Sequence, residues 1–94
     1  MRLTHTEQSA IVQAVQHVDA NAQIYLYGSR ADDGALGGDI DVLLLSEHIN
    51  LMGKLDILAS LRHSLGERKI DVAVFADARK PFAQLALQTG VRLN

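Results

Sequence analysis

"LYGSRADDGALGGDIDVLLL" (residues 26–45) places two aspartates, Asp39 and Asp41, at the start of an apolar run. Both faces of the Val-Leu-Leu-Leu run are apolar, which predicts a central strand that is covered on each side or by a partner. Side chains two residues apart in a strand share a face, so these two project together, about 6.6 Å apart at ~3.3 Å per residue. Ionised carboxylates at that distance repel by about 2.5 kcal/mol at an effective dielectric constant of ~20. The pair therefore predicts a bound divalent cation, and Mg²⁺ prefers carboxylate and phosphate oxygens.

A third carboxylate begins another expected strand. In KIDVAVF (residues 69–75), Asp71 stands near the start, as Asp39 and Asp41 do in theirs. If the two strands are neighbours, the three carboxylates converge at one edge of the sheet. Three such groups can hold two metal ions, which lower the pKa of an attacking hydroxyl and stabilise a phosphoryl group during in-line displacement.

A glycine-serine pair follows the first expected strand and predicts an anion site. Gly28 has no Cβ, so the backbone there can approach a phosphate closely. The backbone N–H and hydroxyl of Ser29, at the start of an expected helical turn, favour a bound anion. Arg30 is interpreted either as a positive charge near the phosphates or as a solvated or structural arginine. Together with the aspartates, these residues predict a site for a nucleoside triphosphate and its magnesium.

The hydrophobic pattern predicts an α/β (α+β) fold with helices packed against a small sheet. Thr4 and Glu7 form a capping-box pattern, and Asn50 is a good helix N-cap. The expected helices cover residues 5–18, 51–64 and 81–88, and the expected strands residues 24–27, 39–45 and 69–75. The second helix is expected to bury a broad apolar face, made of Leu51, Leu55, Ile57, Leu58, Leu61 and Leu65.

Size and composition indicate one domain that covers residues 1–94. Hydrophobic residues make up 48% of the chain and aromatic residues 4%, so the core is expected to be aliphatic. Such a core leaves little room for a deep pocket, and a large acceptor would need a surface from a second chain. Tyr25 and Tyr27 are interpreted as packing residues, with self-modification of either one as the alternative.

Charge and composition argue against several functional classes. The net charge is −2, without a lysine or arginine cluster, so no nucleic acid or anionic membrane is expected as a partner. The absence of cysteine excludes disulfides and thiolate metal sites. The N-terminal residues do not form a signal peptide, and no apolar run reaches the ~20 residues of a membrane span. We therefore expect a soluble, cytoplasmic protein.

Gly28-Ser29, Asp39-Ile40-Asp41 and Asp71 together resemble the nucleotidyltransferases of the DNA polymerase β superfamily. Within that superfamily, "YGSRA…DIDVLLL" is similar to the minimal nucleotidyltransferases, the MntA-type antitoxins that are partnered with HEPN-domain toxins. The resemblance covers roughly residues 8–75. It implies the nucleotidyltransferase fold, with a small mixed β-sheet and helices packed against it.

The resemblance also implies an activity and a role for each motif residue. The activity is ATP- and Mg²⁺-dependent transfer of AMP to a tyrosine hydroxyl of the HEPN toxin, which silences a ribonuclease. Gly28, Ser29 and Arg30 would bind the triphosphate, and Asp39 and Asp41 the metal. Asp71 would complete the metal site and assist deprotonation of the acceptor.

Two departures from the resembled pattern keep alternatives open. Nine residues separate Ser29 from Asp39, a shorter spacer than is common, and Asp32-Asp33 stands where a basic residue and glycine are usual. A catalytically weak protein that neutralises its partner by contact is one alternative. Transfer to a small molecule, as in aminoglycoside-modifying relatives, is another.

The C-terminal segment is more apolar than a polar tail requires. Core packing is the first interpretation of these side chains, and a docking face for a partner or for a second copy, giving a hetero- or homo-oligomer, is the second. The residues concerned are Phe82, Leu85, Leu87, Val91 and Leu93.

Overall fold

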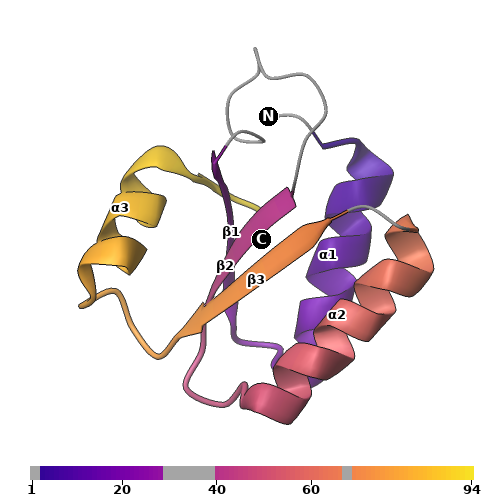
Figure 1. Ribbon diagram of the computed structural model, residues 1–94, viewed down its shortest axis with the longest axis horizontal. Helices are drawn as coiled ribbons and strands as arrows, with labels where there is room; N and C mark the ends of the chain where they lie inside the picture. Colours follow the sequence, from indigo (N-terminus) through magenta and orange to yellow (C-terminus); the bar gives the residue numbers. More distant parts are fainter. Residues whose placement is uncertain (1–2, 29–39, 67–68) are drawn as a thin grey trace.

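The computed structural model describes residues 3–28, 40–66 and 69–94, which form three helices and a four-stranded mixed sheet (Figure 1). The helices are α1 (His5–Val18), α2 (Leu51–Leu65) and α3 (Pro81–Thr89), and the strands are β1 (Gln23–Tyr27), β2 (Ile40–Leu45), β3 (Ile70–Phe75) and β4 (Val91–Arg92). The strand order is β3-β2-β1-β4, with β2 and β3 parallel and the other neighbours antiparallel. The predicted α/β fold class is confirmed.

The helices begin where the capping signals predict. At α1 the side chain of Thr4 accepts a hydrogen bond from the Glu7 backbone N–H, and the Glu7 carboxylate accepts one from the Thr4 N–H. At α2 the Asn50 side chain accepts from the Gly53 N–H at 2.8 Å. None of the described helices combines the length and apolarity that crossing a membrane requires.

The two faces of the sheet differ, because side chains alternate along each strand. Figure 1 shows α1 and α2 together on one face and α3 on the other. The α1/α2 face carries the larger core, in which the fully or nearly buried strand residues are Ile24, Leu26, Ile40, Val42, Leu44 and Val72. On the other face, Leu43 packs with Ala83 and Ala86 of α3. The prediction that the Val-Leu-Leu-Leu strand is central and covered on both sides is therefore confirmed.

The predicted apolar face of α2 is too broad. Ile57 and Leu61 are fully buried, whereas Leu51 and Leu55 remain 69% and 48% exposed. Because α1 and the sheet meet only one side of α2, leucines outside that narrow stripe face solvent.

Sequence analysis does not predict β4. This strand pairs with β1 and places Leu93 in the core, so that part of the apolar C-terminal segment is explained by packing. A Cβ on Gly90 would lie 2.6 Å from the Ala86 carbonyl oxygen and 2.7 Å from that of Leu26. A glycine is therefore needed where the chain passes from α3 to the edge of the sheet.

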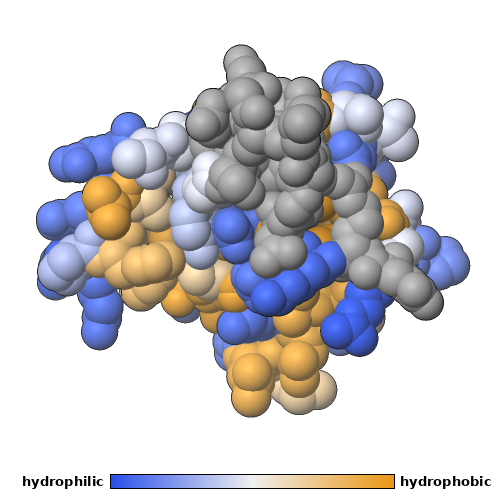
Figure 2. Space-filling model, turned by 45° about the horizontal axis from the view of Figure 1, so that its top comes forward, coloured by the Kyte–Doolittle hydropathy of each residue, from blue (hydrophilic) through white to orange (hydrophobic). Residues whose placement is uncertain are grey.

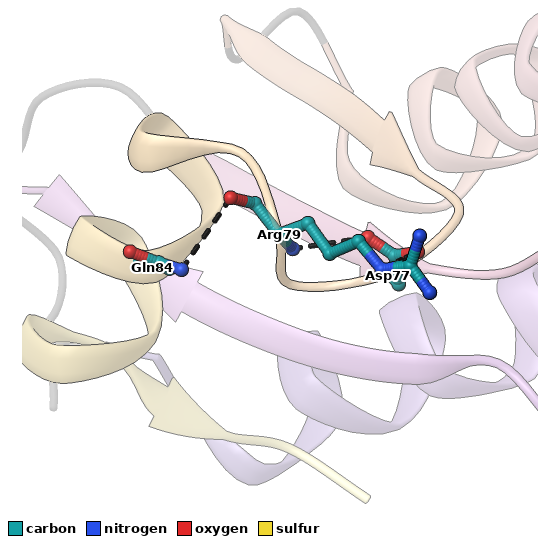
Figure 3. A network of polar contacts seen from close by, with 3 residues as sticks. All are labelled: Asp77, Arg79 and Gln84. Atoms are coloured by element: carbon teal, nitrogen blue, oxygen red, sulfur yellow. Dashed lines mark hydrogen bonds and ion pairs between the residues drawn. The ribbon is translucent and has the colours of Figure 1, made fainter.

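The connection from β3 to α3 is held by polar contacts of its own (Figure 3). The Arg79 N–H donates to Asp77 Oδ1 at 3.0 Å, and Arg79 Nε lies 3.3 Å from Asp77 Oδ2. Gln84 donates back to the Arg79 carbonyl at 3.4 Å. With Pro81 at the first position of the helix, these contacts set where α3 begins.

A buried polar network joins the end of α1 to the β2–α2 connection. Ser46 Oγ donates to the Asp19 carboxylate and accepts from the backbone N–H groups of His48 and Ile49. Asp19 also accepts from the Asn21 N–H at 3.0 Å. The hydrogen bond from Ser46, then that from Asn21, lowers the pKa of Asp19, with a smaller contribution from His48, although burial opposes the shift.

This network predicts a pH-dependent contribution of Asp19 to stability. A folded pKa below the unfolded value stabilises the protein above about pH 4, and that stabilisation is lost as the pH falls through the folded pKa. Asp19→Asn should therefore lower the free energy of unfolding by about 1–2 kcal/mol at pH 7. The difference from the parent protein should shrink below pH 4 in urea denaturation curves.

Asp77→Asn is the matched control, because Asp77 makes the same kind of contact to the backbone two residues on, but at a more exposed position. It should change stability by less than about 0.5 kcal/mol. An Asp19→Asn difference that stays constant from pH 7 to pH 3 would contradict the account.

Candidate functional site

Three polar side chains form a row across the sheet. Tyr27 lies opposite Asp41 in the antiparallel pair of β1 and β2, and Asp41 lies opposite Asp71 in the parallel pair of β2 and β3. Each aspartate is the second residue of its strand. Since neighbouring strands are about 4.8 Å apart, the three residues are adjacent across one end of the sheet.

The row lies on the face of the sheet that α3 shares. Ile40 and Val42, on either side of Asp41, are fully buried beneath α1 and α2, so Asp41 projects from the opposite face. Asp71 alternates in the same way with Val72. Asp41 is partly buried and Asp71 is exposed, which gives the two carboxylates different access to solvent.

The expectation that the strands of Asp41 and Asp71 are neighbours is confirmed. The other predicted site residues, Asp39, Ser29 and Arg30, lie outside the described residues. Residues 3–28, 40–66 and 69–94 contain no group of three or more His, Cys, Asp or Glu side chains that could hold a metal ion. Whether three carboxylates converge, as the sequence predicts, therefore depends on Asp39.

Two opposed carboxylates suit magnesium. Mg²⁺ is commonly held by one or two carboxylates, with substrate phosphates and water completing its coordination. Asp41 and Asp71 supply hard oxygen ligands of this kind from neighbouring strands. Without a cation, like charges placed directly opposite one another destabilise a strand pair, so the same arrangement favours cation binding.

Gly28 fits closely against Asp41. Its φ of +74° is in the region that favours glycine, and a Cβ there would lie 2.6 Å from Asp41 Oδ2. The backbone that follows β1 therefore passes directly beside the carboxylate. This contact places the predicted phosphate-binding glycine next to the predicted metal ligand.

Tyr27 is a neighbour of the carboxylates that sequence analysis does not assign to the nucleotide site. Burial raises the pKa of its phenol, and the negative charges of Asp41 and Asp71 raise it further. The phenol therefore stays protonated at neutral pH. The signal in the sequence was the alternation itself, because Tyr27, unlike Leu26, points to the face that carries Asp41.

Comparison with known proteins identifies the family. The family model described as polymerase β, nucleotidyltransferase, matches residues 9–94. The chain is a member of the polymerase β nucleotidyltransferase family. The match includes the positions of Gly28, Asp41 and Asp71, and the mixed sheet with helices on both faces is consistent with the nucleotidyltransferase fold. No curated protein matches the sequence of this nucleotidyltransferase.

The contact between Gly28 and Asp41 predicts different effects at two glycines. Gly28→Ala and Gly66→Ala both introduce a Cβ at positive φ, and each should lower stability by about 1–2 kcal/mol. Only Gly28→Ala also displaces the Asp41 carboxylate, because a Cβ at Gly66 would meet no atom within 4 Å. Calorimetric titration with ATP and Mg²⁺ should show weaker binding for Gly28→Ala alone. Equal ATP affinity in both variants would contradict this interpretation.

Proposed function

We propose that this nucleotidyltransferase transfers AMP from ATP to a tyrosine hydroxyl of a HEPN-type toxin, and that it is the antitoxin of a cytoplasmic toxin–antitoxin pair. The observation that carries the proposal is the opposed pair Asp41 and Asp71 on an accessible face of the sheet. Membership of the family supports nucleotidyl transfer. The resemblance of the motifs to the MntA-type antitoxins supports the protein acceptor.

The contact between Gly28 and Asp41 supports the proposed nucleotide-binding roles. Asp41, together with Asp39 and Asp71, would hold Mg²⁺, which when bound neutralises carboxylate and phosphate charge and favours attack at phosphorus. Gly28 lies against Asp41, so phosphate bound along this backbone would lie beside the same carboxylate. Ser29 and Arg30 would extend this contact to the remaining phosphates.

Besides completing the metal site, Asp71 is assigned to the acceptor. Its strand, β3, is at the edge of the sheet and its side chain is exposed, so a tyrosine on the surface of another protein can reach it. The tyrosine oxygen attacks the α-phosphorus of ATP and forms a new P–O bond. The bond from that phosphorus to the bridging oxygen breaks and pyrophosphate leaves. The phenolic proton passes to Asp71, which acts as general base.

Both carboxylates should be needed for transfer, and that of Asp71 should not be needed for stability. Asp41→Asn and Asp71→Asn should each abolish transfer of labelled AMP from α-phosphate-labelled ATP to the proposed HEPN-domain partner. Asp71→Asn should leave stability unchanged or raise it by up to about 1 kcal/mol, because it removes one of two like charges on opposed residues. Asp56→Asn, on the exposed surface of α2, is the control and should retain full transfer.

The same variants separate the alternatives. Failure of the parent protein to label the partner, under conditions in which ATP binds, would contradict the proposal. If Asp41→Asn and Asp71→Asn still suppress the ribonuclease activity of the partner, neutralisation by contact is sufficient. Efficient labelling of an aminoglycoside in place of the protein would support the small-molecule alternative.

A further inference from the structure

The chain has four aromatic residues, two tyrosines and two phenylalanines, and the structure gathers all of them on the α3 face of the sheet. Tyr25 and Tyr27 come from β1, Phe75 from the end of β3 and Phe82 from the first turn of α3. An aliphatic core such as this one does not need its aromatic residues on one face. Packing against Leu43, Ala83 and Ala86 accounts for Tyr25, Tyr27 and Phe75, but it does not account for the exposed side chain of Phe82.

Phe82 is at the centre of this group. Its ring meets Tyr27 edge to face, with ring centroids 5.7 Å apart and an interplanar angle of 87°. Its centroid is also 5.8 Å from that of Phe75. Contacts with two rings restrain Phe82, yet the residue is 49% exposed. It is thus an aromatic side chain held in place with part of its surface open to solvent.

Tyr25 is engaged elsewhere. The Arg92 guanidinium lies over the Tyr25 ring, 6.0 Å from the centroid, and the Tyr25 hydroxyl donates to the Gln23 side chain at 3.0 Å.

Figure 2 shows apolar surface over α3, at the left of the view. Phe82 and Leu85 are the largely exposed apolar side chains of that helix.

The aromatic group is continuous with the carboxylates. Tyr27 belongs to both, because it pairs with Asp41 across the strands and with Phe82 through its ring. Asp41 and Tyr27 lie on neighbouring strands, which are about 4.8 Å apart, and the ring centroids of Tyr27 and Phe82 are 5.7 Å apart. Besides burial, the negative charges of Asp41 and Asp71 raise the pKa of the Tyr27 phenol, which agrees with this proximity. A nucleotide with its α-phosphate at the carboxylates can place its ribose across this interval and its base at Phe82.

We propose that Phe82, held by Tyr27 and Phe75, is the stacking surface for the base of the nucleoside triphosphate. This inference rests on the proposed function, because it requires the triphosphate to bind at Asp41 and Asp71. Every nucleobase presents an aromatic face, so stacking is tolerant of base identity. The site should therefore bind GTP within a few-fold of ATP.

The experiment compares a ligand that has a base with one that has none. Calorimetric titrations with ATP and with inorganic tripolyphosphate, both with Mg²⁺, are made on the parent protein and three variants. Phe82→Ala should weaken ATP binding roughly tenfold or more and leave tripolyphosphate binding within twofold. Phe82→Trp, which keeps an aromatic face, should restore ATP affinity. Leu85→Ala, which removes an exposed apolar side chain on the same helix, should bind both ligands as the parent does.

Several results would overturn the inference. One is unchanged ATP affinity in Phe82→Ala. If the KM for the partner protein rises in that variant while ATP affinity stays the same, Phe82 contacts the acceptor and not the base. Another is an equal loss of ATP and tripolyphosphate binding, which would indicate a distorted site. If the parent protein binds neither ligand, the inference and the proposed function both fail. If the variants behave as expected but no AMP reaches the partner, only the proposed function fails.

Discussion

The register between β2 and β3 is the constraint on which the rest of the site depends. In this register Asp41 faces Asp71, while Val42 and Val72 lie side by side beneath the helices. A slip of β3 by one residue would turn every side chain of the strand to the other face and direct Asp71 into the apolar core. Burying an unpaired carboxylate there is strongly unfavourable. The apolar contacts that stabilise the fold therefore also keep the two carboxylates opposed.

The two faces of the sheet divide stability from function. One face is covered by α1 and α2, which pack over an aliphatic core. The apolar residues of that core fix which side chains of each strand point inward. The other is only partly covered by α3, and it carries the unfavourable features: opposed like charges, a glycine at positive φ and a half-exposed phenylalanine. Each of these features is costly for folding, and each has a use if a magnesium nucleotide binds on this face.

Sequence reasoning succeeded where local chemistry decides the outcome. The hydrogen bonds of Thr4 and Asn50 at helix starts, and the apolar alternation of the strands, depend on neighbours in the chain. The adjacency of Asp41 and Asp71 could be predicted only on the condition that their strands are neighbours. Which strands pair depends on tertiary structure and cannot be read from local sequence. The edge-to-face contact of Phe82 with Tyr27 could not be predicted, since it depends on where α3 packs. The two-residue strand β4 has too short a pattern to be recognised.

The central claim is that Asp41 and Asp71 share one bound cation beneath a nucleotide. A crystal structure grown with Mn²⁺ and a non-hydrolysable ATP analogue tests it most directly, because anomalous scattering locates manganese without ambiguity. The account predicts an anomalous peak within direct coordination distance of carboxylate oxygens from both aspartates and of a phosphate oxygen. Manganese and phosphates bound at any other part of the surface, with the two carboxylates uncoordinated, would contradict it.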